Sequence, residues 1–113
     1  MTSNVAELSH IWQPLEIGPI TVEHRIMATG HTQLYGVDEV ISDRHVAYYR
    51  ERALGGASLL ILEQQAAHPS GMNYDQGCIA WDPRVVPEYA KLADAVHEFG
   101  TKQFVQLFCC GAQ

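Results

Sequence analysis

Residues 42–63 read SDRHVAYYRERALGGASLLILE, a helix pattern followed directly by a strand pattern. Ser42 and Asp43 can cap a helix, apolar side chains recur at helical spacing after them, and Gly55-Gly56 can terminate it. Residues 58–63 are then almost continuously apolar, which is typical of a parallel strand covered on both faces. We therefore predict a helix that ends before Gly55 and a buried strand over 58–63.

A small hairpin and a first strand precede this unit. Leu15–Ile17 and Ile20–Val22 alternate apolar with polar residues around Gly18-Pro19, as two strands joined by a tight turn do. Residues 24–28 form a short apolar run that opens into a polar loop at Thr29. We predict a hairpin and then a buried strand over 24–28.

A second helix and a third strand follow it. Asp82-Pro83 can start a helical turn, and Pro87 fits the first position of a helix, where its missing N–H costs nothing. That helix has one apolar face and ends at Gly100, and residues 104–108 form another apolar run. The order strand, helix, strand, helix, strand makes two βαβ units, which form parallel sheets.

The fold class is therefore α/β, and periodicity leaves two architectures open, a doubly wound open sheet and a closed (β/α)8 barrel. Neither Gly-x-Gly-x-x-Gly nor Gly-x-x-x-x-Gly-Lys-Ser/Thr follows the first predicted strand, which disfavours the nucleotide-binding open sheets. The sequence contains no internal repeat and no shift in composition, so we draw no domain boundary.

Composition and charge narrow the classes of partner. The formal net charge is -6 and the basic residues are scattered, which argues against nucleic acid as a ligand. No segment approaches the ~20 apolar residues that cross a bilayer, and the first ten residues lack a leader pattern. We expect a cytoplasmic protein with no membrane partner. Its three cysteines, two of them adjacent, suit reduced thiols better than a disulfide framework.

Polar groups follow the apolar run of each predicted strand, at Thr29–Thr32, at Glu63–Gln65 and at Gln106. Because the carboxyl ends of parallel strands converge, we expect a ligand site there. The amide of Gln106 offers a donor and an acceptor to a flat heterocycle such as a flavin, and Gly30 lets backbone approach such a ligand closely. The alternative is that Gln106 and Thr32 only satisfy backbone groups at the strand ends.

Several blocks, in the same order, resemble the old yellow enzyme or NADH:flavin oxidoreductase superfamily. WQPLEIGPITVEHRIM, residues 12–27, is similar to its Pro-Leu-x-Ile-Gly-x-x-Thr-Leu-x-Asn-Arg pattern, with His24 in place of Asn. Residues 48–63 resemble its Tyr-x-x-Arg-Ala-x-Gly-Gly-x-Gly-Leu-Ile-Ile-Thr-Glu block, and HPSG at 68–71 and HEFG at 97–100 continue the likeness. The branch of trimethylamine dehydrogenase and 2,4-dienoyl-CoA reductase is the most similar.

The resemblance implies that residues 1–113 are the amino-terminal part of a single FMN-binding TIM (β/α)8 barrel domain. A barrel of this type typically needs about 250 residues, so an opening β-hairpin and about three βα units are present and the remainder is absent. The catalytic and phosphate-binding residues belong to later strands and stay unknown, and no metal is expected. The implied FMN-binding residues are Gly30, His31, Thr32, Gln64 and Gln106.

Three positions depart from the family pattern in informative ways. Thr32 stands where the trimethylamine dehydrogenase branch has a cysteine linked covalently to FMN, so the resemblance implies non-covalent FMN. The family often continues Gln-Leu-x-His-x-Gly-Arg after the third strand, where this chain has Cys109 and Ala112 in place of His and Arg.

The implied function is that of an FMN-dependent oxidoreductase that passes hydride from NAD(P)H through FMN to an electron-poor alkene or similar small-molecule acceptor. The alternatives are an FMN amine dehydrogenase of the same superfamily, a non-enzymatic remnant, and a thiol or metal module. An iron–sulfur cluster and FAD are expected only in a longer form, and a homo-oligomer is open for the full-length protein. We expect the 113-residue chain alone to be an inactive fragment that binds FMN weakly or not at all.

Some side chains have a structural interpretation that we prefer. His31 is expected to pack in the flavin loop rather than to act in acid–base chemistry, and Glu63 to be a buried anchor at the strand end. Cys109-Cys110 with His31 is a disfavoured metal site, because adjacent cysteines ligate one ion with poor geometry. Tyr35 either lines the substrate pocket or is an exposed loop aromatic.

Overall fold

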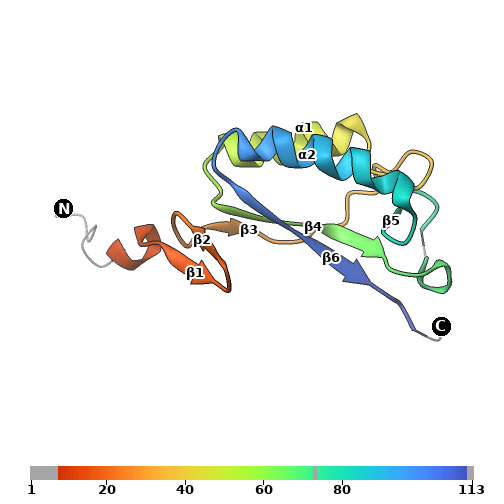
Figure 1. The fold of residues 1–113 in the computed structure, drawn as a ribbon, viewed down its shortest axis with the longest axis horizontal. Coiled ribbons are helices and arrows are strands. Elements are labelled where there is room, and N and C mark those ends of the chain that lie inside the picture. Colours follow the sequence, from red (N-terminus) through yellow and green to blue (C-terminus); the bar gives the residue numbers. More distant parts are fainter. Residues whose placement is uncertain (1–7, 73, 112–113) are drawn as a thin grey trace.

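The computed structural model describes residues 8–72 and 74–111 and consists of a small hairpin beside a helix-covered parallel sheet (Figure 1). After a 3-10 turn, η1 (Ser9–Trp12), β1 (Leu15–Ile17) and β2 (Ile20–Val22) pair antiparallel. Gly18 makes their tight connection with φ 57°, a left-handed conformation that glycine adopts without strain. The hairpin has the predicted bounds.

The main sheet has four strands, β3 (Met27–Ala28), β4 (Leu59–Ala66), β5 (Cys78–Ile79) and β6 (Lys102–Phe108). All its pairings are parallel. β6 runs beside β4 along its length, whereas β3 pairs with the first residues of β4 and β5 with the last. β4 is therefore the central strand. Because its neighbours run parallel to it, the loops that follow them leave toward the carboxyl end of β4.

Two helices cover one face of this sheet and lie side by side (Figure 1). They are α1 (Asp43–Leu54) and α2 (Val86–His97), and short turns η2 (Pro69–Gly71) and η3 (Pro83–Val85) lie in the connection from β4 to α2. The buried cluster between helices and sheet comprises Ile41, Tyr49, Ala53, Leu60, Leu62, Cys78, Leu92 and Val96. Within the described ranges, no helix is long and apolar enough to span a membrane.

The sheet is covered unevenly. Most side chains of β4 are buried, but β6 is mostly exposed, and Leu107 is 67% accessible. An apolar strand normally loses this surface to further protein. Within the described ranges, the helix side of the sheet is therefore buried, whereas most side chains of β6 are exposed.

The bounds of several elements differ from the sequence prediction. The strand expected over 24–28 is reduced to β3, because the N–H of Arg25 bonds to Ile11 and the N–H of Ile26 bonds to the His24 ring. β4 and β6 are longer than expected, since pairing with each other extends both. α2 begins one residue before Pro87, and β5 was not predicted.

Candidate functional site

A β-bulge in β4 determines which way its polar side chains point. Ile61 lies opposite Phe104, whereas Gln64 lies opposite Gln106, so three steps along β4 match two steps along β6. The extra residue interrupts the strict alternation of faces, and the two β4 residues between Ile61 and Gln64 are both buried. Bulges of this kind re-aim side chains next to binding sites.

The sheet face away from the helices brings together three of the predicted site residues. Glu63 and Gln65 both contact helix side chains, so alternation points Gln64 to the opposite face, where Gln106 is its partner. Gly30 approaches the same place. A Cβ on Gly30 would overlap the amide oxygen of Gln106 and lie 3.1 Å from a β4 carbonyl oxygen. A side chain at position 30 would therefore push the Gln106 amide away from the loop.

His31 and Thr32 continue the loop from Gly30 and are exposed. The carbonyl of His31 accepts a hydrogen bond from the side-chain amide of Gln33. Neither side chain forms a hydrogen bond with Gln64 or Gln106 in the described part of the chain. The structure thus assembles Gly30, Gln64 and Gln106, and places His31 and Thr32 on the adjoining loop.

Glu63 points to the helix side and is only 2% exposed. Its Oε2 accepts hydrogen bonds from the backbone N–H groups of Gln33, at 2.7 Å, and Leu34, at 3.3 Å, and its Oε1 contacts the His45 ring. Burial alone would raise the pKa of this carboxyl, but the hydrogen bonds from His45 and Gln33 outweigh it and hold the pKa below its ordinary value. Glu63 is therefore an ionised anchor, as expected for this residue.

The hydrogen bonds of His45 identify its tautomer. Its Nδ1 lies 3.1 Å from the backbone nitrogen of Ser42, in a capping box at the start of α1. A backbone N–H can only donate, so Nδ1 is the acceptor and Nε2 carries the ring proton. That proton is donated to Glu63. The pair consists of a neutral imidazole and a carboxylate.

His45, Glu63 and Cys78 also form the one group of three neighbouring metal-ligand types found among the described residues, with ligand atoms within 4.8 Å of one another. His45 and Glu63 of this set already bond to each other inside the fold. His45 Nε2 already carries a proton, and burial, together with the charge of Glu63, raises the pKa of the Cys78 thiol to about 12. A metal would have to displace both protons and the bonds of Glu63.

The adjacent cysteines lie elsewhere, at the end of β6. Cys109 is exposed and packs against the backbone of Gly71, and Cys110 Sγ lies 3.9 Å from the carbonyl oxygen of Ser70. In the described ranges, His31 does not join them in a group of potential ligands. Ala112, the other departure from the family pattern, lies outside the described residues.

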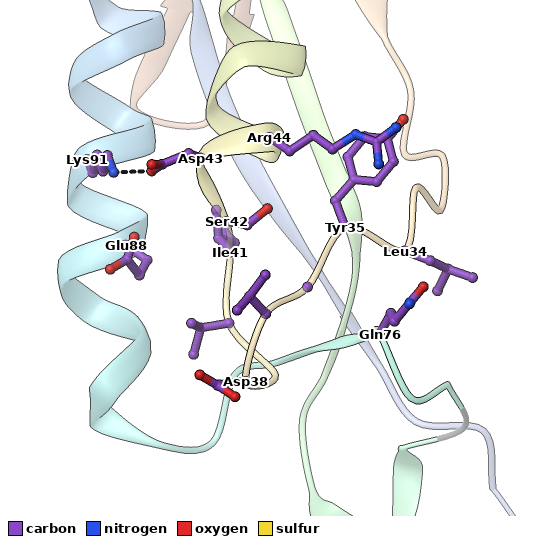
Figure 2. Close-up of a pocket in the computed structure, with 13 residues that line it drawn as sticks. Leu34, Tyr35, Asp38, Ile41, Ser42, Asp43, Arg44, Gln76, Glu88 and Lys91 are labelled. Carbon is purple, nitrogen blue, oxygen red and sulfur yellow. Dashed lines mark hydrogen bonds and ion pairs between the residues drawn. The ribbon is translucent and has the colours of Figure 1, made fainter.

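A cavity of about 650 Å³ lies between the β3–α1 loop and the first turns of α2 (Figure 2). Tyr35 forms part of its wall and packs under the Arg44 guanidinium, 3.8 Å from the ring centroid. An ion pair between Lys91 and Asp43 borders it on the α2 side. None of the five predicted cofactor residues lines this cavity. Tyr35 is a packed, half-buried loop aromatic there and is not freely exposed.

The sequence analysis missed the roles of His45, Gln33 and the Tyr49 hydroxyl. The sequence did contain a signal for His45, because Ser42-x-x-His45 has capping-box spacing. His45 and Tyr49 are also four residues apart, which places them on one helix face. No local signal marks Gln33, whose partners are Tyr49 of α1, Glu63 of β4 and His31 of its own loop.

A family model described as the NADH:flavin oxidoreductase / NADH oxidase family matches residues 10–113. An N,N-dimethylglycine/sarcosine dehydrogenase of Chromohalobacter salexigens is 32% identical over 104 residues, which cover 86% of this chain and 14% of that protein. An NADPH dehydrogenase of Bacillus subtilis is 31% identical over 107 residues, which cover 89% and 30%. The chain spans less than a third of the length of these curated relatives.

Solved structures are also similar to this chain. The old yellow enzyme from Pichia sp. AKU4542 superposes with a TM-score of 0.84 at 27% identity, over 90% of this chain and 27% of that one. Morphinone reductase in complex with tetrahydroNAD gives a TM-score of 0.82 at 25% identity, over 89% and 27%. The described fold is thus part of an old yellow enzyme TIM barrel, which confirms the predicted barrel and excludes the open sheet.

Proposed function

Because the chain belongs to the NADH:flavin oxidoreductase / NADH oxidase family, we propose that it acts as part of a longer FMN-dependent NAD(P)H oxidoreductase that reduces an electron-poor alkene or similar small molecule. The observation that carries this proposal is the cluster of Gly30, Gln64 and Gln106 at the carboxyl ends of β3, β4 and β6. Ligands of parallel α/β sheets and barrels bind at these ends.

The residues of this cluster fit a flat heterocycle. Because Gly30 has no Cβ, its backbone lies directly against the Gln106 amide, which brings the loop and the amide to one place. Gln106 is exposed, and its amide combines a donor with an acceptor, which matches the alternating N–H and C=O groups of a flavin pyrimidine edge. Gln64 adds a second amide across the β4–β6 ladder. These three residues, with His31 and Thr32 on the adjoining loop, would hold FMN without a covalent bond.

When bound, FMN supplies the redox chemistry, taking hydride from the nicotinamide and delivering it to the acceptor. The part of the work that falls to this chain is binding and orientation. The amides of Gln64 and Gln106 would orient the ring edge, and the loop from Gly30 to Thr32 would cover part of the ring. Substrate selection and proton donation fall to residues outside this chain.

The test is purification of the longer protein with and without Gln106→Ala. We expect yellow protein that NADPH bleaches, and FMN affinity about tenfold lower in the variant, because one or two hydrogen bonds to the ring are lost. Gln13→Ala, at an exposed glutamine of the amino-terminal segment, is the matched control and should leave FMN affinity unchanged. Colourless protein that takes up no FMN contradicts the proposal.

A second candidate function is an FMN amine dehydrogenase. It is favoured by the Chromohalobacter relative and by a probable N-methylproline demethylase of Rhizobium meliloti, which is 32% identical over 99 residues. The two candidates differ in the electron donor. Reduction of the flavin by a secondary or tertiary methylamine, with no response to NADPH, would favour the amine dehydrogenase, whereas the reverse favours the first proposal.

The isolated chain is proposed to be inactive. Most of its β6 side chains are exposed, with Leu107 67% accessible, and an open strand edge favours aggregation or pairing with other protein. Gel filtration of the 113-residue chain mixed with FMN tests this, and we expect less than stoichiometric FMN in the protein peak. Stoichiometric retention would contradict it.

A further inference from the structure

The loop of residues 29–34 is tied to the helix side of β4 by a buried carboxylate. Glu63 Oε2 receives the consecutive backbone N–H groups of Gln33 and Leu34, at 2.7 and 3.3 Å. Consecutive N–H groups that converge on one oxygen form an anion-binding turn. The carboxylate itself is 2% exposed, so water does not compete for these bonds.

The conformation of Leu34 shows why this loop needs support. Its φ is 57°, in the left-handed region, which is unfavourable for a side chain that branches like leucine. A backbone in this region persists only where neighbouring interactions hold it. Here the bond from the Leu34 N–H to Glu63 provides such an interaction.

A second connection reaches the same loop through α1. The backbone N–H of Glu63 donates to the Tyr49 hydroxyl at 2.7 Å, and that hydroxyl donates to Gln33 Oε1 at 3.1 Å. The amide nitrogen of Gln33 then donates to the carbonyl of His31. The relay therefore runs from β4 to the backbone of the residue that follows Gly30.

The orientation of Glu63 is itself fixed from α1. His45 Nε2 donates to Oε1, and His45 Nδ1 is held by the backbone of Ser42. Because both ring nitrogens are engaged, the imidazole cannot rotate without breaking a bond. Oε2 is left facing the loop.

We propose that Glu63, oriented by His45 and assisted by Tyr49, is a positioning residue that holds the 29–34 loop in the conformation in which Gly30 meets Gln106. Glu63 does not touch the cofactor cluster and acts through the loop. The inference rests on the proposed function for the identity of the cofactor. The loop geometry itself stands on the hydrogen bonds described above.

The experiment compares four variants of the longer protein. Glu63→Gln keeps the shape of the side chain but puts an amide N–H against one of the three donors that now meet the carboxylate. Tyr49→Phe removes only the hydroxyl. Glu51→Gln changes an exposed glutamate of α1 and is the matched control. Val96→Ala lowers stability through the buried core, away from the 29–34 loop, and shows what general destabilisation does.

Two quantities are measured, hydrogen exchange of peptides covering residues 29–36 in the FMN-free protein and the Kd for FMN. We expect Glu63→Gln to speed the exchange and to weaken FMN binding, each about tenfold, and Tyr49→Phe to do so about threefold. Glu51→Gln and Val96→Ala should leave both close to wild type.

The outcomes separate the two proposals. Loop exchange in Glu63→Gln and Tyr49→Phe that equals that of Glu51→Gln overturns the positioning role, whatever happens to FMN. Faster exchange with an unchanged FMN Kd overturns it as well, because the loop would then not position the cofactor. Wild-type protein that binds no FMN contradicts the proposed function, and the exchange data alone then decide whether Glu63 holds the loop.

Discussion

The polar side chains on the two sides of β4 differ in how many hydrogen bonds they form within the protein. On the helix side, Glu63 is buried and accepts three hydrogen bonds, and Gln65 bonds to Tyr89. On the opposite side, Gln64 and its partner Gln106 present amides near a glycine backbone. Gln64 thus faces the proposed ligand site directly, whereas Glu63 can act on it only through the 29–34 loop. A change in the apolar core of the helix side should act on stability, and a change on the open side on binding.

The largest expected effect is loss of stability on the helix side. Leu62 is fully buried between β4 and the helices, so Leu62→Ala should lower the free energy of unfolding by about 3 kcal/mol, through lost burial and a residual cavity. Chemical denaturation of the longer protein measures this. Leu54→Ala, at a mostly exposed leucine of α1, should cost less than about 1 kcal/mol. Equal losses of stability in Leu62→Ala and Leu54→Ala would contradict the expected difference between the buried and the exposed leucine.

A smaller effect is expected on the open side. Gly30→Ala puts a Cβ where the Gln106 amide oxygen lies, and the flexible end of Gln106 must move away. We expect FMN affinity to fall about tenfold, which is about 1.4 kcal/mol, while the unfolding midpoint changes little. Fluorescence titration with FMN and a denaturant curve give the two quantities. A large loss of stability with unchanged FMN affinity would mean that Gly30 serves the fold and not the FMN site.

The buried carboxylate also predicts a pH dependence. Because the folded protein holds the pKa of Glu63 below its ordinary value, the unfolded state binds the proton more readily. The stabilising contribution is therefore present above the unfolded pKa, about 4.3, and is lost as pH falls through the lower folded pKa. Unfolding measured from pH 6 down to pH 3 should show a steeper decline in wild type than in Glu63→Gln. Parallel curves would show that folding does not shift the pKa of Glu63.

The smallest effect should come from an exposed carboxylate. Glu39 pairs with Arg84 at 2.7 Å, but both side chains are about half exposed, so water competes with the ion pair. Glu39→Gln should change the free energy of unfolding by less than about 0.5 kcal/mol, and added salt should reduce even this difference. A loss comparable to that of Leu62→Ala would mean that this surface is covered in the longer protein.

Elements with local signals could be predicted from the sequence. The bounds of the hairpin and of α1 agree with the structure, because a tight turn at Gly18, a capping residue at Ser42 and Gly55-Gly56 act within a few residues of chain. β5 could not be predicted in the same way. Its two residues form a strand only because the end of β4 offers a free edge.

The sequence by itself determined the fold class, the family and the identity of the residues at the strand ends, including Gly30, Gln64 and Gln106. Only the tertiary structure decided that Glu63 faces the helices and Gln64 the open side. The reason is the bulge, a mismatch in length between β4 and β6 that neither strand contains alone. The same holds for the 29–34 loop, whose support comes from a helix and a strand that meet only in the folded chain.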